Sequence, residues 1–270
     1  MSDLTSRFDY YSATFPDGFG KCSVDVLKHL GDGPPRKSRG VYGYNRGWQI
    51  VRDGDVVVTC QEAPNRPDYV FTAGGYSPEV ATVLRRAVRD HTVPRLDVCV
   101  DFGGGDAAFS DTRSQVFGLL SGKVTLTDYV SHGLDGAPAA SLLFGKRKNS
   151  EAYGRMYRAG LVHEELVRET NRMELECKPA KPDRRRHLAT LEPWEVWGWA
   201  RWSRTLADNL FGLWAPAAPP RSARLSDRER SLNALAAQWN RVLWELVEYH
   251  GGDVDTAFLD LLNRTNGPSW

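Results

Sequence analysis

Tyrosines, arginines and carboxylates recur at every second position in three short segments of this chain. Side chains of a β-strand alternate between its two faces, so residues two apart share a face. On that rule, one face of each segment carries Tyr153, Arg155 and Tyr157; Arg95, Asp97 and Asp101; and Arg172, Glu174 and Glu176. The opposite faces are apolar, as at Leu96, Val98 and Leu175. Three neighbouring strands would therefore present phenols, guanidiniums and four carboxylates to one surface.

Such a surface has the groups that a metal-assisted tyrosine nucleophile needs in order to attack a phosphate. A phenol has a pKa of about 10, so it is a poor nucleophile at neutral pH. A divalent ion on the phosphate offsets this weakness, because it neutralises oxygen charge and orients the phosphorus. Mg²⁺ and Mn²⁺ prefer oxygen ligands, which the four carboxylates could supply.

Each of these groups also has a purely structural interpretation. Asp97 and Asp101 could form salt bridges with Arg95 and Arg172 on a solvated sheet face. Tyr153 could be an ordinary sheet aromatic or could stack on a DNA base. The joint pattern favours a cation, because four carboxylates on one surface repel each other unless a positive charge lies between them.

The composition neither indicates nor excludes a nucleic-acid partner. Lys and Arg number 35 against 34 Asp and Glu, a net charge of +1, whereas many DNA-binding proteins are strongly basic. A carboxylate cluster would offset basic patches elsewhere, so the net charge does not show whether the protein binds nucleic acid. The cysteines form no CxxC pair, which argues against structural zinc. With no apolar signal region and no membrane-spanning stretch, we expect a cytoplasmic protein with no membrane partner.

Strand and helix patterns alternate over the first two-thirds of the chain and then give way to helices. Strands are predicted at 7–15, 41–51, 55–61, 69–72, 95–102, 141–145, 152–158 and 172–178. This order predicts an α+β fold with a mostly antiparallel sheet, helices on one face, and a C-terminal α-helical segment. The helices that end before Gly31 and begin at Ser77 would cover one face and leave the carboxylates on the other. We place a catalytic domain at 1–190 and a helical region at 191–270.

In order along the chain, these motifs resemble the Rep-trans family of rolling-circle replication initiators. The elements are Arg95-x-Asp97-x-x-x-Asp101-Phe102, a basic loop, Arg155-x-Tyr157 and Arg172-x-Glu174-x-Glu176. The family includes initiators of staphylococcal-type plasmids, with related relaxases of conjugative elements and phage initiators. The resemblance is best from Tyr69 to Lys178, and the relaxase/replication-initiator-like fold it implies agrees with the predicted sheet.

The resemblance assigns roles to individual residues. It makes Tyr157, and not Tyr153, the DNA nucleophile, with Arg155 as its catalytic partner. It places a Mg²⁺ or Mn²⁺ site on the acidic strands, at Asp97, Asp101, Glu174 and Glu176. The family usually has a polar residue and a lysine after the tyrosine, whereas this chain has Arg158 and Ala159. Arg158 could supply the cation one position early, or it could point away from the active face.

Basic side chains near these strands are the candidates for DNA contact. The loop Lys146–Lys148 suits backbone phosphates. The run Lys178–His187 is either a solvated linker or a phosphate contact beside the Glu176 strand. The predicted DNA-binding residues are Lys146, Arg147, Lys148, Tyr153, Arg158, Arg95, Arg172, Arg184, Arg185 and Arg186.

The sequence thus predicts a metal-dependent, site-specific DNA nickase and strand transferase that initiates rolling-circle replication at a plasmid or phage origin. Its partners would be origin DNA, as duplex or hairpin and as single strand; a host helicase and a homodimer are left open. Three alternatives also stay open. The protein could be a conjugative relaxase, a DNA-binding regulator of the same fold without catalysis, or a metal nuclease that uses water and not tyrosine.

Overall fold

The computed structural model describes residues 4–16, 23–132, 138–148, 150–217 and 227–264. The chain forms two compact units, Met1–Ala218 and Pro219–Trp270. The first unit contains all of the described strands, and it is the unit in which every predicted site residue lies.

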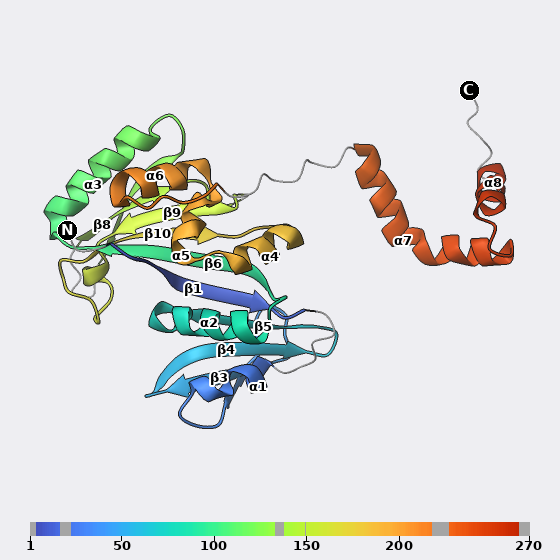
Figure 1. Ribbon diagram of the computed structural model, residues 1–270, viewed down its shortest axis with the longest axis horizontal. Coiled ribbons are helices and arrows are strands. Elements are labelled where there is room, and N and C mark those ends of the chain that lie inside the picture. Colours follow the sequence, from blue (N-terminus) through green and yellow to red (C-terminus); the bar gives the residue numbers. More distant parts are fainter. Residues whose placement is uncertain (1–3, 17–22, 133–137, 149, 218–226, 265–270) are drawn as a thin grey trace. The chain divides into compact units, whose positions relative to one another are not determined.

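A single antiparallel sheet of ten strands organises the first unit (Figure 1). The strands are β1 (Ser6–Thr14), β2 (Arg36–Arg39), β3 (Arg46–Arg52), β4 (Asp55–Ala63), β5 (Arg66–Ala73), β6 (Thr92–Phe102), β7 (Leu126–His132), β8 (Pro138–Phe144), β9 (Ala152–Tyr157) and β10 (Asn171–Cys177). Their order in the sheet is β2-β3-β4-β5-β1-β6-β10-β9-β8-β7. The three segments that carry the predicted site, β6, β10 and β9, are therefore direct neighbours near the middle of the sheet.

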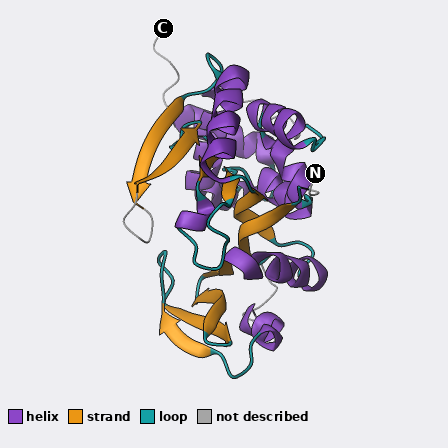
Figure 2. Ribbon diagram, turned by 90° about the vertical axis from the view of Figure 1, so that its left-hand side faces the viewer, coloured by secondary structure: helices purple, strands orange, loops and turns teal. Residues whose placement is uncertain are grey.

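Helices cover one face of this sheet, as Figures 1 and 2 show from two directions. They are α1 (Ser23–Leu27), α2 (Ser77–Ala87), α3 (Gly105–Leu120), α4 (Pro182–Thr190), α5 (Pro193–Val196) and α6 (Arg201–Phe211). Helix α2 packs on β1, α4 packs on β6, and α5 packs on both strands. With the second unit, the described residues hold eight helices, and the predicted α+β class is confirmed.

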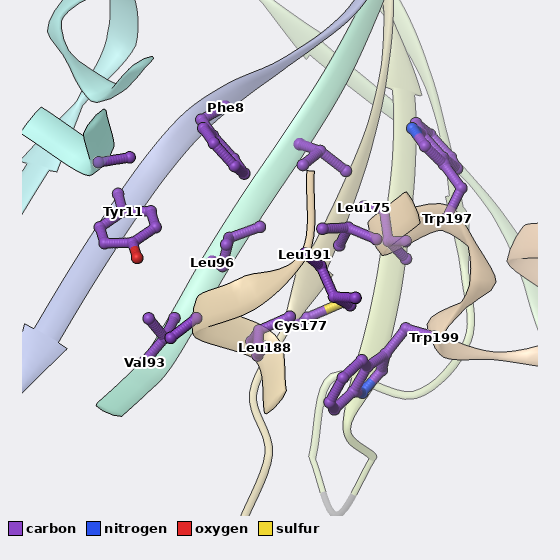
Figure 3. Packing of buried hydrophobic residues seen from close by; sticks show 14 of the residues in the cluster. Phe8, Tyr11, Val93, Leu96, Leu175, Cys177, Leu188, Leu191, Trp197 and Trp199 are labelled. Carbon is purple, nitrogen blue, oxygen red and sulfur yellow. The ribbon is translucent and has the colours of Figure 1, made fainter. Parts of the chain in front are cut away.

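The alternation of side chains along the central strands explains why the helices choose this face. Leu96, Leu175 and Cys177 are fully buried beneath the helices, where Leu188 and Trp197 meet them (Figure 3). Burying one large apolar side chain contributes about 1.5–3 kcal/mol. The polar residues that alternate with these apolar side chains point to the opposite face of the sheet. The helices named above do not cover that face.

The tryptophan-rich segment after residue 190 belongs to this core and corrects the predicted domain boundary. Trp197 and Leu206 are fully buried, and Trp199 is 5% exposed. The indole nitrogen of Trp197 also donates a hydrogen bond to Ser6 Oγ in β1, at 3.0 Å. Because these contacts join the segment to the sheet, the first unit continues to Ala218 and does not end at residue 190.

The second unit contains two described helices, α7 (Asp227–Tyr249) and α8 (Val254–Arg264), as the sequence predicts. The chain turns between them at Gly251 and Gly252, both with positive φ, a conformation that glycine adopts without steric cost. His250 Nε2 lies 3.0 Å from Asp260 Oδ2 across the turn. No helix in the described part of the chain has both the length and the apolar character needed to cross a membrane.

Candidate active site on the open face of the sheet

The register of β6, β10 and β9 brings the predicted site residues to one face. Residues directly opposite each other in an antiparallel pair have their side chains on the same face. The opposed rows are Tyr153–Glu176–Asp97, Arg155–Glu174–Cys99 and Tyr157–Arg172–Asp101. The shared face predicted from two-residue spacing is therefore confirmed, and Tyr157 is not turned into the apolar core.

A pocket of about 400 Å³ lies over these rows. Eight of the predicted residues line it: Arg95, Asp97, Arg147, Tyr153, Arg155, Tyr157, Glu174 and Glu176. The sequence did not single out the other lining residues, which are Tyr129, Ser141, Leu143, Val162 and His163. These come from β7, from β8 and from the segment after β9, so the pocket forms where the centre of the sheet meets its β7 edge.

The Tyr157 hydroxyl lies between a carboxylate and an imidazole. The hydroxyl donates to Glu174 Oε1 at 2.5 Å and lies 3.1 Å from His163 Nε2. The residue is 8% exposed. Burial raises the pKa of the Tyr157 phenol above its usual value of 10, and the negative charge of Glu174 raises it further. The hydroxyl is therefore protonated at neutral pH, and any attack by this oxygen requires a neighbouring group to accept its proton.

His163 is the residue of this group that sequence reasoning missed. It follows Tyr157 by six positions, after the short 3-10 turn Ala159–Leu161. The amide of His163 donates to Ala159 O at 2.9 Å, which directs the chain back towards the strand end. An isolated histidine in a loop carries no periodic signal, so only the fold could reveal this contact.

Arginines hold the three pocket carboxylates. Arg155 forms an ion pair with Glu174. Arg95 Nε lies 3.0 Å from Asp97 Oδ1, and its Nη2 lies 3.1 Å from Glu176 Oε2. Asp97 and Arg95 therefore do form the salt bridge that the structural interpretation of the sequence predicts.

Burial nevertheless raises the pKa of Asp97 to about 6, because Arg95 only partly offsets the desolvation and Glu176 and Glu174 are close. Three carboxylates are therefore crowded together on the pocket floor, even with the arginine in place.

Asp101 and Arg172 form a second cluster beside the pocket and do not line it. Arg172 Nε lies 2.6 Å from Asp101 Oδ1, and its Nη1 lies 3.1 Å from Asp9 Oδ1. Arg7 also pairs with Asp101, at 2.8 Å. Asp9 reaches this cluster from a β-bulge between Phe8 and Tyr10. With only 4% of its side chain exposed, Arg172 is not available to DNA, which corrects its predicted role.

The predicted four-carboxylate metal site is not assembled. Asp97, Glu174 and Glu176 offer hard oxygen donors to one pocket, but Asp101 stands apart and each of the three is paired with a basic side chain. Within the described residues, no three His, Cys, Asp or Glu side chains are grouped so as to hold a metal ion. The donor types fit Mg²⁺ or Mn²⁺, whereas the arrangement requires Arg95 and Arg155 to release their carboxylates first.

Two more predicted DNA contacts are corrected by burial. Arg158 has 7% of its side chain exposed and forms an ion pair with Asp106, so it points away from the pocket. Arg184 has 5% of its side chain exposed, binds Glu151 Oε2 at 2.9 Å and covers the ring of Trp199 at 4.3 Å. Both arginines stabilise the fold and cannot meet a phosphate without rearrangement.

The other predicted basic residues lie at the surface. Lys146, Arg147 and Lys148 are exposed in the β8–β9 loop, and Arg147 lies 5.7 Å from the ring of Tyr153. Arg185 and Arg186 belong to α4, so this basic run is a helix and not a linker. Arg186 is exposed, and Arg185 Nε donates to Pro179 O at 2.9 Å.

Comparison with solved structures gives an informative likeness. The chain is similar to a rolling circle replication initiator protein from Geobacillus stearothermophilus, with a TM-score of 0.54. The match covers 87% of this chain and 96% of that chain. The two proteins share a fold. Sequence identity is 17%, so the likeness establishes the architecture and not the chemistry. No protein-family model matches the chain, and no curated protein sequence matches it.

Proposed function

We propose that this protein initiates rolling-circle replication by nicking and rejoining one strand of origin DNA. The observation that carries the proposal is the hydroxyl of Tyr157, held by Glu174 and His163 in a pocket that three arginines also line. The fold shared with a rolling circle replication initiator supports the same function. A plasmid or phage origin is the expected target, and Rep-trans membership is part of the proposal.

The reaction would be a transesterification at a DNA phosphate. The Tyr157 oxygen forms a bond to phosphorus while the bond from phosphorus to the 3′ oxygen breaks, which leaves a 5′-phosphotyrosine and a free 3′-OH. Glu174 or His163 accepts the phenol proton, and the leaving 3′ oxygen takes up a proton in return. The covalent bond preserves the phosphodiester, so the strand can be rejoined without ATP. The free 3′-OH can prime a polymerase.

Arginines would bind the phosphate that reacts. Arg155 and Arg95 border the pocket floor, and Arg147 borders it from the β8–β9 loop. A guanidinium can donate two parallel hydrogen bonds to a phosphate, and such charge-assisted bonds are stronger than neutral ones. A phosphate that recruits Arg155 and Arg95 would leave Glu174 and Asp97 without their partners.

Mg²⁺ or Mn²⁺ remains part of the proposal, with Asp97, Glu174 and Glu176 as the residues that would hold it. Bound there, the ion would supply charge neutralisation at the phosphate. This site would open when Arg95 and Arg155 release the carboxylates of Asp97 and Glu174. Equilibrium dialysis with Mn²⁺, with and without an oligonucleotide, tests this, and Mn²⁺ uptake unaffected by Asp97→Asn would contradict the assignment.

The deciding experiment is to trap the covalent adduct. Single-stranded oligonucleotides from the host replicon's origin are incubated with the protein and Mn²⁺, and mass spectrometry locates the DNA-linked tyrosine. We expect the adduct on Tyr157, and we expect Tyr157→Phe to bind DNA but to form no adduct. Tyr153→Phe is the matched control, because Tyr153 lines the same pocket without a contact to Glu174.

The same experiment separates the alternatives. A water-using nuclease would leave a free 5′-phosphate and would tolerate Tyr157→Phe. A regulator without catalysis would bind supercoiled origin DNA and leave it closed. A conjugative relaxase would form the tyrosine adduct on a transfer origin. A host helicase and a second copy of the chain remain proposed partners, to be tested by co-purification and by sedimentation.

A further inference from the structure

A cluster of aromatic rings lies on the same face of the sheet as the tyrosine pocket, two strands beyond β6. Ser12 in β1 is opposite Arg95 on one side and Phe71 in β5 on the other, so all three share a face. Tyr69 lies two residues before Phe71 and therefore faces the same way. The face that carries the proposed nucleophile thus continues into an aromatic surface.

The rings of this surface are close enough to act as one platform. Tyr69 lies 5.8 Å from Phe71 and 6.0 Å from Tyr44, measured between ring centroids, with the Tyr44 ring nearly parallel. Tyr42 meets the edges of Tyr69 and Phe71 at 5.9 and 6.0 Å. Tyr42 is 69% exposed. We call Tyr42, Tyr44, Tyr69 and Phe71 the aromatic platform.

The loop that presents Tyr42 is held in place at some conformational cost. Tyr42 has φ of 54°, in the left-handed region that a bulky residue rarely adopts. Tyr44 N donates to Val41 O at 3.0 Å to close the turn, and Val41 N donates to the side chain of buried Gln61 at 2.8 Å. The fold therefore maintains an exposed tyrosine in a disfavoured conformation.

Cations surround the platform and connect it with the tyrosine pocket. A cavity of about 470 Å³ is lined by Tyr42 and Tyr69 together with Arg95, Lys178 and Arg185. None of the described residues that line this cavity carries a carboxylate. Arg95 also lines the tyrosine pocket, so the two cavities share a wall. On the far side, the guanidinium of Arg66 lies 4.1 Å from the ring of Tyr44.

We infer that the aromatic platform and its flanking cations bind single-stranded DNA that continues from the tyrosine pocket. Bases stack on aromatic rings whatever their sequence, and a basic groove follows the backbone phosphates. Four strand spacings separate β9 from β5, about 19 Å, which a stacked strand covers in about six nucleotides. The inference rests on the proposed function, because it takes the strand at the nick as the ligand.

Fluorescence anisotropy with labelled oligothymidylates tests the platform without requiring cleavage. The change is Tyr42→Asn with Tyr69→Leu, since asparagine tolerates the left-handed turn. We expect the affinity for an oligothymidylate of about sixteen nucleotides to fall about tenfold or more. Tyr76→Asn is the matched control, because Tyr76 also lies under an arginine, at 5.0 Å, but borders neither cavity.

Two outcomes would overturn the inference. One is unchanged affinity in the double variant; the other is an equal loss for duplex DNA of the same length. Photo-crosslinking of the wild-type protein with iodouracil in the oligonucleotide gives an answer that does not depend on how the variants fold. The crosslinked peptide should contain Tyr42, Tyr44 or Tyr69, and crosslinks confined to other segments would contradict the platform.

The results also separate this inference from the proposed nicking reaction. Tyr157→Phe should bind oligothymidylate as the wild type does, since Tyr157 lies outside the platform. If the platform variants lose binding but no tyrosine adduct ever forms, the nicking proposal fails and the single-strand surface stands. If the adduct forms on Tyr157 while the platform variants bind normally, the single-strand surface fails and the nicking proposal stands.

Discussion

At the scale of single residues, the protein surrounds one phenol with charged partners. Glu174 contacts both the Tyr157 hydroxyl and the Arg155 guanidinium, so it links the proposed nucleophile to a proposed phosphate ligand. Removing its charge would leave the phenol without its closest proton acceptor while the shape of the pocket is kept.

We therefore expect Glu174→Gln to slow cleavage by about 10²–10⁴-fold, the usual contribution of a general base. Affinity for the oligonucleotide should stay near the wild-type value, because Arg155 is then free to bind phosphate. Single-turnover cleavage of an origin oligonucleotide measures the rate, and anisotropy measures the affinity. The control is Glu164→Gln, at an exposed position in the loop after β9. Equal rates for the two variants would contradict the role of Glu174.

His91 provides a second prediction at this scale, one that concerns stability. Its Nδ1 lies 2.6 Å from Val88 O, and its Nε2 lies 2.7 Å from the Tyr11 hydroxyl, which fits a neutral ring with the proton on Nδ1. Burial lowers the pKa of His91 below its ordinary value of 6.5 in spite of the contact with the Val88 carbonyl, and nearby Arg85 lowers it further.

Because the folded protein resists protonation of His91, the unfolded chain binds the extra proton first as the pH falls. The contribution of His91 to stability is full above about pH 6.5, the ordinary histidine pKa, and decreases below it. Urea denaturation at neutral and mildly acidic pH should show a smaller acid loss for His91→Gln than for the wild type. An identical pH dependence in both proteins would refute this.

At the scale of elements, the close pairing of β8 with β9 determines how precisely the site residues are positioned. Gly154 in β9 faces Phe144 in β8. A Cβ on Gly154 would collide with the Phe144 ring, whereas a Cβ on Gly103 would meet nothing within 4 Å. The missing side chain lets β8 and β9 pair closely, directly beside Arg155.

Gly154→Ala should therefore destabilise the protein by about 1–3 kcal/mol, the usual cost of overpacking a core. The measurement is the urea midpoint followed by circular dichroism, with Gly103→Ala as the control. A Gly154→Ala protein as stable as this control would show that the strands can separate without cost.

The same scale explains what the sequence could and could not predict. Alternation along β6, β9 and β10 was strong enough to place seven site residues on one pocket, and the basic loop between β8 and β9 added Arg147. Strands β2 and β7 were missed, because they lie at the two edges of the sheet and lack a clear apolar alternation. The bulge at Asp9 and the separation of Asp101 depend on register between distant segments, which local patterns do not encode.

At the scale of the whole molecule, the boundary at Ala218 makes a direct prediction about truncation. A chain that ends at residue 218 should unfold cooperatively, because it keeps Trp197 and Leu206 in the core. A chain that ends at residue 190 should not fold, because the apolar face of the sheet would lose these partners. Thermal unfolding by circular dichroism compares the two, and cooperative unfolding of the shorter chain would restore the predicted boundary.

The central position of β10 has a consequence for how the protein tolerates disorder. All seven residues of this strand are buried, and it has a hydrogen-bonded neighbour on each side. Backbone amides in such a position become accessible to solvent only in the rarest opening events. Glu174 and Glu176 are thus carried by a segment that stays ordered while the edges of the sheet fray, so a DNA strand could loosen the periphery without disturbing the groups that would react with it.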